Sequence, residues 1–339
     1  MMQLQRRTQI LAALGRQLKE RPAALQTVVE RACTHNPWFT PQSVWQAIDA
    51  ITANYLNEAE LHQWISGYKI QHLPQTVKTI GLVMAGNIPM VGFHDFLCVF
   101  ISGHRAQVKL SAKDNQLFPF IASLLKQIDA EFHQHLEITE QLKGFDAVIA
   151  TGSNNSARYF EHYFGKYPHI IRKNRNSVAI LTGNETPADI DLLGKDVFDY
   201  YGLGCRNVSK LMVPQNYSFP YLLSHLEHYA GIMQHHKYKN NYDYYRSVYL
   251  LNRQPHFASD FLILIENSAL ASPVSVVHYE YYTGENDLNN QLMNQQEQIQ
   301  CVVAAPKPGS SFVPFGSAQQ PRLWDYADHT DTLQFLLEL

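Results

Sequence analysis

The sequence carries little net charge and few charged residues. Asp, Glu, Lys and Arg make up 17% of its 339 residues, and the formal net charge is −3. Proteins that bind nucleic acid usually show a basic excess or a basic stripe, and neither stands out here. Hydrophobic residues make up 45%, which is typical of a globular chain. We therefore expect a globular protein whose partners do not include nucleic acid.

Cysteine is also scarce, and its spacing excludes two further classes. The four cysteines lie far apart, with no Cys-x-x-Cys pair: Cys33, Cys98, Cys205 and Cys301. This spacing does not build a disulfide scaffold or a zinc knuckle, and it fits a reducing cytoplasm. Two short-spaced histidine pairs, His133-x-His135 and His225-x-x-His228, lack an obvious third ligand. We expect solvated helix faces there, and no metal site.

Long apolar runs are missing as well. The most apolar run, residues 96–102, is far too short to cross a bilayer, which takes about 20 residues. Near the amino terminus Arg16, Lys19 and Arg21 interrupt the apolar residues, so that stretch indicates an amphipathic helix and not a signal peptide. We expect a soluble, cytoplasmic protein without a membrane span.

The chain does show a change of pattern near residue 76. Residues 1–75 repeat apolar positions at three-to-four spacing and predict a helical amino-terminal segment. From residue 76, short β-rich runs alternate with helical patterns, with glycine at strand exits, which predicts parallel sheets. We assign residues 76–175, completed by 311–339, to one domain and residues 176–310 to a second. The predicted fold class is α/β.

Cys205 has the strongest local signal for chemistry. It follows Gly202-x-Gly204 and precedes the apolar run 211–213 of a predicted strand. Glycines beside a thiol let backbone N–H groups approach closely, which suits a nucleophile whose attack creates an oxyanion. A buried structural cysteine in a turn shows the same local pattern, so the residues alone leave both interpretations open.

Four loop motifs occur in order along the chain: Asn87-Ile88-Pro89, Val108-Lys109-Leu110-Ser111, Thr151-Gly152-Ser153 and Phe198-x-x-x-Gly202-x-Gly204-Cys205. In this order and spacing they resemble the aldehyde dehydrogenase superfamily. The end of the chain resembles its fatty acyl-CoA reductase branch, the bioluminescence type: Val313-Pro314-Phe315-Gly316-x-Ala318-Gln319-x-Pro321-x-Leu323-x-Asp325-Tyr326-Ala327-Asp328. The resemblance covers about residues 76–339. It implies an aldehyde dehydrogenase-like fold in which a cofactor-binding domain and a catalytic domain, assigned to 76–175 and 176–310, meet at a cleft.

The resemblance gives Cys205 the role of nucleophile. Its thiolate would attack a thioester carbon and expel the CoA thiol, leaving a thioester on the enzyme. Asn87 matches the family asparagine whose amide, with the N–H of the cysteine, donates to the oxyanion. One such donor is typically worth about 3 kcal/mol. Without the resemblance, Asn87 is explained as well by a turn before a proline.

The resemblance also implies a nicotinamide cofactor. Gly152 and Ser153 open a helix directly after a strand, where N–H groups and the helix dipole can face a pyrophosphate. Ser153 could equally be an ordinary helix cap. Lys109 matches the family lysine that binds the adenosine ribose, although a solvated strand end also explains it. The family glutamate for the ribose 2′-hydroxyl is replaced by Ala112, and Lys113 follows, so we expect NADPH, with NADH as the alternative.

Two departures from the family pattern bear on the reaction. The segment whose glutamate activates water for deacylation aligns with residues 172–176, Arg-Lys-Asn-Arg-Asn, which hold no carboxylate. Oxidation of an aldehyde to an acid would need that base, whereas reduction of a thioacyl intermediate gains from its loss. The glutamate that holds the nicotinamide ribose is out of register. The Gly-Pro-Val that ends its motif matches Ser272-Pro273-Val274, and Glu266 is the nearest acid and our candidate.

We therefore predict NADPH-dependent reduction of a fatty acyl thioester to the aldehyde through a thioacyl intermediate on Cys205. The expected substrate is a fatty acyl-CoA or an acyl-carrier-protein thioester, and the resemblance is compatible with a homo-oligomer or an acyl-transferring partner subunit. Two other functions stay open. A cofactor-independent thioesterase or acyltransferase would use the same cysteine, and a catalytically inactive binding or assembly partner would leave Cys205 unreactive.

Overall fold

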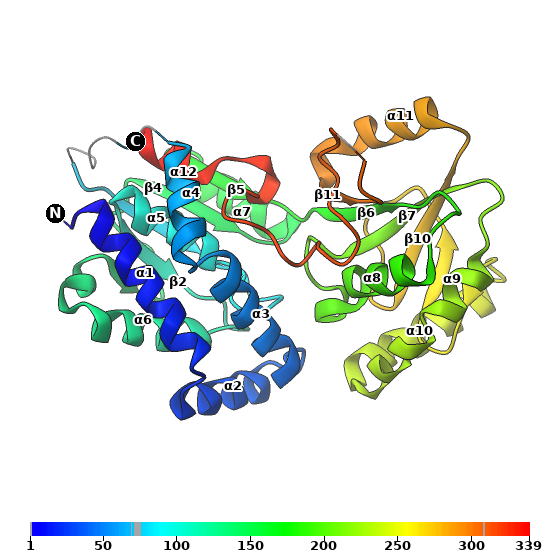
Figure 1. Cartoon of the computed structure of the whole chain (residues 1–339), viewed down its shortest axis with the longest axis horizontal. Helices are drawn as coiled ribbons and strands as arrows, with labels where there is room; N and C mark the ends of the chain where they lie inside the picture. Colours follow the sequence, from blue (N-terminus) through cyan, green and yellow to red (C-terminus); the bar gives the residue numbers. More distant parts are fainter. Residues whose placement is uncertain (1, 69, 71–75, 308) are drawn as a thin grey trace. The chain divides into compact units, whose positions relative to one another are not determined.

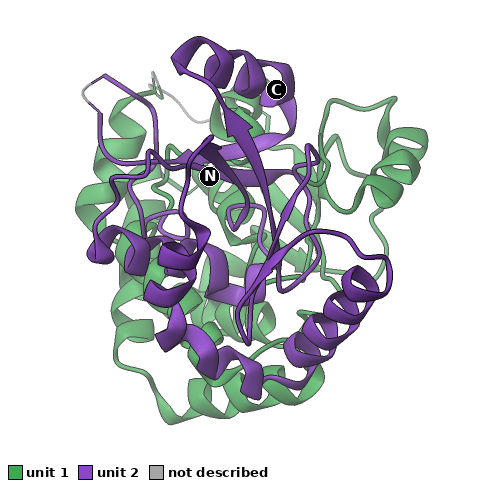
Figure 2. Cartoon of the chain, turned by 90° about the vertical axis from the view of Figure 1, so that its right-hand side faces the viewer, with its two compact units in different colours: residues 1–174, 321–339 green, residues 175–320 purple. Residues whose placement is uncertain are grey.

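The computed structural model describes residues 2–68, 70, 76–307 and 309–339. The chain divides into two compact units, residues 1–174 with 321–339 (unit 1) and residues 175–320 (unit 2), drawn in green and purple in Figure 2. Each unit is built on a largely parallel β-sheet with helices packed on it (Figure 1). The predicted α/β class, with two parallel-sheet domains, is confirmed.

Unit 1 begins with four helices: α1 (Leu4–Lys19), α2 (Ala23–His35), α3 (Pro41–Asn54) and α4 (Glu58–Ser66). Their apolar faces, such as Ile10, Leu14 and Leu18 of α1, share one hydrophobic core with the sheet of the same unit. The helices are therefore an integral part of unit 1. Residues 71–75 of the predicted helical segment 1–75 lie outside the described residues.

The sheet of unit 1 has five parallel strands in the order β3-β2-β1-β4-β5. They are β1 (Thr79–Val83), β2 (Arg105–Lys109), β3 (Leu136–Ile138), β4 (Ala147–Thr151) and β5 (His169–Arg172). Its helices are α5 (Phe93–Ser102) after β1, α6 (Leu117–Ile128) after β2, α7 (Asn154–Phe164) after β4, and α12 (Thr332–Leu337), which packs on α5. The strand order changes direction between β1 and β4.

The sheet of unit 2 has the order β11-β6-β7-β10-β9-β8, in which only the edge strand β8 is antiparallel. The strands are β6 (Asn176–Ile180), β7 (Val208–Pro214), β8 (Phe257–Ala258), β9 (Ile263–Glu266), β10 (Val276–Tyr282) and β11 (Ile299–Val303). The helices are α8 (Pro187–Phe198), α9 (Phe219–His225), α10 (His236–Leu251) and α11 (Glu285–Gln295).

Successive side chains along each strand of unit 2 point to opposite faces of the sheet, and different helices cover the two faces. Met212 packs with Leu288 of α11, whereas its neighbour Leu211 packs with Ile190 of α8. Figure 1 shows α11 on one side of this sheet and α8, α9 and α10 on the other. Both faces are buried, which is why the strands read as apolar runs in the sequence.

The end of the chain is divided between the units. Residues 311–320 belong to unit 2 and residues 321–339 to unit 1, whereas the sequence prediction grouped all of 311–339 with 76–175. Val313 pairs with β11, and the N–H groups of Gly316 and Ala318 bond to α8, so this stretch is held within unit 2.

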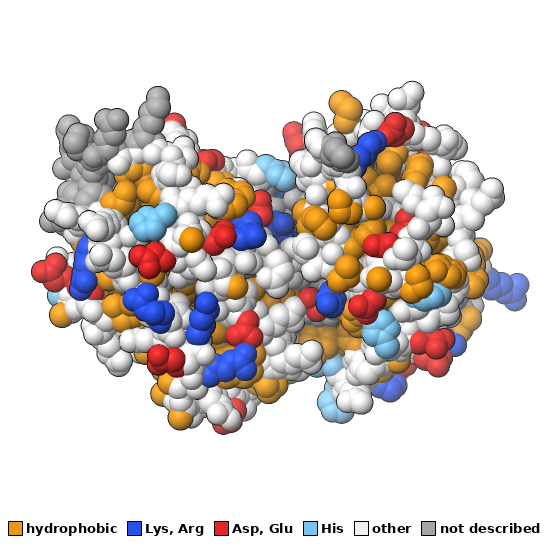
Figure 3. Space-filling view, in the orientation of Figure 1, with side chains coloured by type: hydrophobic (Ala, Val, Ile, Leu, Met, Phe, Trp, Pro, Cys, Tyr) orange, Lys and Arg blue, Asp and Glu red, His pale blue; other side chains and the backbone are white. Residues whose placement is uncertain are grey.

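The surface is mixed in charge. On the face shown in Figure 3, lysine and arginine side chains lie among acidic ones and do not form a single stripe. In the described part of the chain, no helix is both long and apolar enough to cross a membrane.

Candidate active site

Three of the predicted loops follow neighbouring strands of unit 1. Strands β1, β2 and β4 are adjacent and parallel, so their carboxyl ends lie at one edge of the sheet. Asn87 follows β1, Lys109 ends β2 and Gly152 follows β4. The fold thus brings these residues to one edge, where the strand order changes direction and where open α/β sheets bind their ligands. The side chains of Asn87 and Lys109 are exposed there.

The loops after β1 and β2 are held against each other. A Cβ on Gly86 would lie 2.7 Å from the Ser111 hydroxyl, so only glycine lets the two loops approach this closely. The buried carboxylate of Asp114 accepts a hydrogen bond of 2.7 Å from the Met90 N–H across the same contact. Burial raises the pKa of Asp114 to about 6. These contacts fix the backbone that carries Asn87.

Helix α2 supports the turn after β2 from the other side. Nδ2 of Asn36 donates to the carbonyl oxygen of Lys113 (3.1 Å), and Nε2 of His35 contacts the carbonyl oxygen of Ala112 (2.6 Å). The side chain of Lys113 is exposed. Lys109 and Lys113 are therefore two exposed cations in one loop, with no carboxylate at position 112.

The loop after β4 is a capped helix start. The hydroxyl oxygen of Ser153 accepts a hydrogen bond of 3.2 Å from the Ser156 N–H and so caps α7. A Cβ on Gly152 would lie 2.8 Å from both the Phe160 ring and Ser156, so the loop lies close against its own helix. The capping interpretation of Ser153 is confirmed. Contact of Gly152 and Ser153 with a pyrophosphate stays a prediction.

Cys205 lies in unit 2, in the turn between α8 and β7. Before that turn, Tyr200, Tyr201 and Gly202 take left-handed backbone angles in succession, with φ of 51°, 59° and 74°. A left-handed residue other than glycine costs roughly 1–3 kcal/mol, so surrounding contacts must hold this stretch in place. The thiol at its end is half-buried.

Asn207 holds the turn that carries the thiol. Its side chain is buried, and its Oδ1 accepts a hydrogen bond of 2.8 Å from the Gly204 N–H. Its Nδ2 donates to the carbonyl oxygens of Asp196 (3.1 Å) and Asp199 (2.8 Å) at the end of α8. One amide therefore satisfies terminal helix carbonyls and locks the Cys205 turn to them.

Cys205 lies at the amino-terminal edge of the sheet of unit 2. On one side, the Ser177 hydroxyl of β6 donates to the carbonyl oxygen of Cys205 (3.0 Å). On the other side, β7 and β10 pair in parallel and begin at the same level. Residues 274–275 form the turn that leads directly into β10. The segment matched to the family Gly-Pro-Val thus ends at the start of β10, the strand that neighbours β7.

Glu266 does not join this group. It ends the short strand β9 at the level of Tyr279, midway along β10, whereas Cys205 precedes β7 at the amino-terminal edge of the sheet. It lines a hollow of about 430 Å³ together with Asn267 and Glu280. Tyr279 pairs in turn with Leu211 of β7, which lies six residues after Cys205, so the geometry gives no support to Glu266 as the nicotinamide-ribose ligand.

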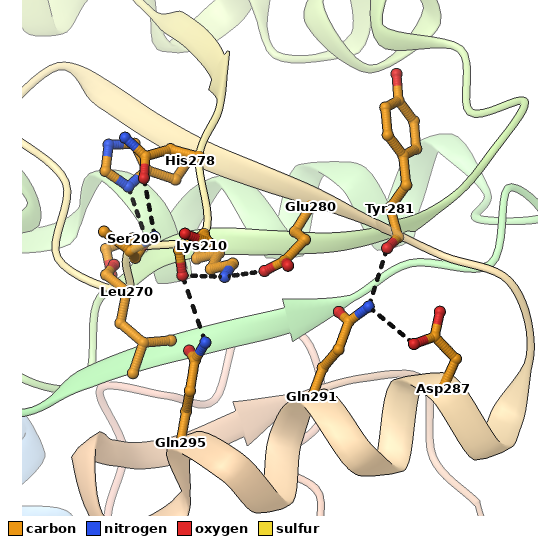
Figure 4. A network of polar contacts seen from close by, with 12 residues as sticks. Ser209, Lys210, Leu270, His278, Glu280, Tyr281, Asp287, Gln291 and Gln295 are labelled. Atoms are coloured by element: carbon orange, nitrogen blue, oxygen red, sulfur yellow. Dashed lines mark hydrogen bonds and ion pairs between the residues drawn. The ribbon is translucent and has the colours of Figure 1, made fainter.

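Residues 268–270, which follow Glu266, are held through their three consecutive backbone carbonyl groups, each of which contacts a side chain of β7 or β10 (Figure 4). The contacts run from Lys210 Nζ to Ser268 (2.7 Å), from His278 Nδ1 to Ala269 (2.8 Å) and from Ser209 Oγ to Leu270 (2.7 Å). The Lys210 side chain is fully buried on the α11 face and also pairs with Glu280. Because this segment leads to residues 274–275, the Lys210–Glu280 pair helps to fix the chain that enters β10.

Arg172 begins the stretch that aligns with the family's water-activating segment. It ends β5, it is buried, and its guanidinium pairs with Asp95 of α5 and donates to the Thr332 hydroxyl of α12 (2.7 Å). The next residue, Lys173, pairs with Glu161 of α7 (2.9 Å). Both cations are engaged within unit 1, and the stretch offers no carboxylate as a base.

One histidine of each sequence pair makes a polar contact with a residue of its own unit. Nδ1 of His133 contacts the carbonyl oxygen of Ala130 (2.7 Å), and His228 Nε2 pairs with Asp191 (2.6 Å). In the described residues, no three His, Cys, Asp or Glu side chains are grouped to hold a metal ion.

Three residues of the candidate site were not found from the sequence: Ser177, Asn207 and Asp114. An asparagine two residues after Cys205 in a glycine-rich stretch is typical of a turn, so a structural role for Asn207 could have been predicted from the sequence. Ser177 and Asp114 have partners 28 and 24 residues away, and no local pattern marks them.

Comparison with known proteins supports the fold. No protein-family model matches the chain, and no curated protein matches it in sequence. Aldehyde dehydrogenase 21 from Physcomitrella patens, solved in complex with the reaction product succinate, has a TM-score of 0.71 at 11% identity, covering 99% of this chain and 84% of that one. An aldehyde dehydrogenase from Mycobacterium tuberculosis, complexed with NAD⁺, has a TM-score of 0.66 at 12% identity, covering 94% and 84%. The chain has the aldehyde dehydrogenase fold, as predicted.

Proposed function

We propose that the protein reduces a fatty acyl thioester to the aldehyde with a nicotinamide cofactor, through a thioester on Cys205. The proposal rests on one combination: an aldehyde dehydrogenase fold with a half-buried thiol on a turn locked to α8 and β6. A nucleophile gains rate from a fixed approach to the carbonyl carbon, and a locked turn supplies it. The fatty acyl-CoA reductase branch is favoured by the motifs of the sequence.

The first step is acyl transfer to Cys205. Its thiolate attacks the carbonyl carbon, a new C–S bond forms, and the thioester bond breaks so that the thiol leaving group departs and takes up a proton. We assign the Asn87 amide to the oxyanion, where one donor is typically worth about 3 kcal/mol. A reduced nicotinamide, when bound, supplies the hydride to the acyl carbon. Collapse of the thiohemiacetal on Cys205 then releases the aldehyde and restores the thiol.

The stretch 172–176 favours reduction over hydrolysis. Arg172 is turned into a buried ion pair with Asp95, and no carboxylate of the stretch can activate water. A thioester on Cys205 that meets no general base survives long enough to receive a hydride.

The loops of unit 1 fit a dinucleotide. Lys109 and Lys113 place two exposed cations at the sheet edge, and the first N–H groups of α7 follow Gly152. Positive charge without a carboxylate at position 112 favours a 2′-phosphate, so we propose NADPH, with NADH as the alternative.

The test is the loss of NADPH absorbance with acyl-CoAs from short to long and with acyl-carrier-protein thioesters. Cys205→Ser is run beside Cys33→Ser, which changes another half-buried thiol in unit 1. Oxidation that needs the thioester, disappears in Cys205→Ser and persists in Cys33→Ser is expected. Release of the free thiol without loss of NADPH would indicate a thioesterase or acyltransferase. Neither thiol release nor NADPH oxidation would indicate a binding or assembly partner.

A further inference from the structure

A stretch near the end of the chain crosses the carboxyl end of α8. We call residues 313–319 the strap. The strap joins β11 through Val313, and its N–H groups at Gly316 and Ala318 donate to the two carboxylate oxygens of Asp196, at 2.6 and 2.9 Å. One acidic side chain thus accepts two backbone hydrogen bonds from one short stretch.

The contact between the strap and α8 is closely packed. Asp196 is 1% exposed, and Phe315 and Ala318 of the strap are buried in the core of unit 2. Gly316 has a φ of 78°, and a Cβ there would lie 2.7 Å from the Leu192 side chain of α8. Any other residue would be strained at this left-handed position, which fits the close approach of the strap to α8.

The strap also reaches the turn of the thiol. Arg206, the residue after Cys205, donates from Nε to the carbonyl oxygen of Ala318 at 2.6 Å. The N–H of Ala318 bonds to the Asp196 carboxylate, and its carbonyl oxygen bonds to Arg206. A continuous path of hydrogen bonds therefore runs from the Asp196 carboxylate through the strap to the residue next to Cys205.

We propose that Asp196 is a positioning residue for the Cys205 thiol, acting through the strap and Arg206. This inference rests on the proposed function only in treating Cys205 as the nucleophile. Asp196 itself touches no reacting atom. Its carboxylate fixes the strap, the strap fixes the Arg206 side chain, and the turn cannot shift while both ends of this path are held.

The path depends on the charge of the carboxylate. An ionised carboxylate accepts on both oxygens, whereas a protonated one carries a hydrogen on one of them and loses one good acceptor for the strap. Burial raises the pKa of Asp196 to about 6, and this value already includes the lowering by the Gly316 and Ala318 N–H groups and by Arg206 and the smaller rise caused by Asp199. Tyr229 is a further titratable neighbour, and burial raises its pKa far above neutrality. Positioning should therefore weaken as the pH falls through about 6.

The test measures alkylation of Cys205 by iodoacetamide, located by peptide mass analysis, in the full-length wild-type protein and in Asp196→Asn. The matched control is Asp191→Asn, the same charge change at a half-exposed residue of α8 that pairs with His228. At pH 8 we expect alkylation about tenfold slower in Asp196→Asn and within twofold of wild type in Asp191→Asn. The ratio of wild-type to Asp196→Asn rates should fall toward one by pH 5.

A role limited to folding makes a different prediction. It would leave the ratio constant with pH, or tie it to the unfolded fraction measured by circular dichroism, and either result would overturn the proposal. If Asp196→Asn does not fold, Arg206→Lys breaks the same path while keeping the positive charge, and it should slow alkylation at pH 8 to a similar extent. An unchanged rate in Arg206→Lys would equally overturn it.

The positioning role of Asp196 and the proposed reductase activity can be rejected independently of each other. Slower alkylation in Asp196→Asn without any thioester-dependent NADPH oxidation by the wild type would retain the positioning role and reject the reductase. Wild-type turnover with unchanged alkylation and kcat in Asp196→Asn would retain the reductase and reject the positioning role.

Discussion

Replacing Lys210 by methionine should strongly destabilise unit 2. The Lys210 ammonium lies in the sheet with no exposed surface, where it pairs with Glu280 and donates to the carbonyl oxygen of Ser268 (2.7 Å; Figure 4). Methionine nearly fills the same space but leaves a carboxylate and a carbonyl without their cation.

The size of the effect follows from burial. Removing one partner of a buried ion pair typically costs about 3–5 kcal/mol, because the other charge is left uncompensated. The Glu280 side chain is 29% exposed, so water can solvate part of the carboxylate. We therefore expect the lower end, about 3 kcal/mol, which is roughly a hundredfold change in the unfolding equilibrium constant.

Urea unfolding followed by circular dichroism measures this change. The matched control is Lys239→Met, which breaks the exposed pair with Asp243 on α10 and should cost about 0.5 kcal/mol or less. The double variant Lys210→Met/Glu280→Gln should regain part of the loss, because it no longer buries an unpaired carboxylate. A Lys210→Met protein as stable as the Lys239→Met control would refute the reasoning.

Three further outcomes are expected. Asn87→Ala should lower kcat/KM for the acyl thioester by about 10²–10³ through loss of one oxyanion donor, and a change below threefold in steady-state assays would remove Asn87 from the site. Ser153→Ala should lower the free energy of unfolding by about 1 kcal/mol in urea titrations through loss of the α7 cap, and no change would contradict the capping role. Burial raises the pKa of Asp114 from 3.8 to about 6, so its contribution to stability is full below pH 3.8 and is lost as the pH rises through about 6. The unfolding free energy of wild type relative to Asp114→Asn should then fall by about 2 kcal/mol between pH 4 and pH 7, and parallel pH curves would contradict this.

Most of the sheet core could be predicted from the sequence. Strands β1, β4 and β7 are apolar runs bounded by glycine or polar turns, and such runs predict buried parallel strands. The run 261–265 carried the same signal for β9 and was overlooked. The pattern of residues 221–233 predicts one helix, whereas in the structure α9 ends at His225 and a 3₁₀ segment, Glu227–Gln234, follows it.

The candidate site was less predictable. Motif order identified the loops of Asn87, Lys109 and Cys205, because each follows or precedes a recognisable strand. Asp196 sits on a helix where an acid normally indicates a solvent-exposed face, and only the strap, more than 100 residues later, explains its burial. Glu266 was chosen by proximity in sequence, and the direction of β9 carries it away from Cys205.

Mass analysis of the protein incubated with an acyl-CoA, first without cofactor and then with NADPH, tests the central claim most directly. We predict an acyl adduct on the peptide that contains Cys205, stable until NADPH is added and then released as the aldehyde. An adduct on another residue, or release as the acid at a rate that NADPH does not change, would contradict the account.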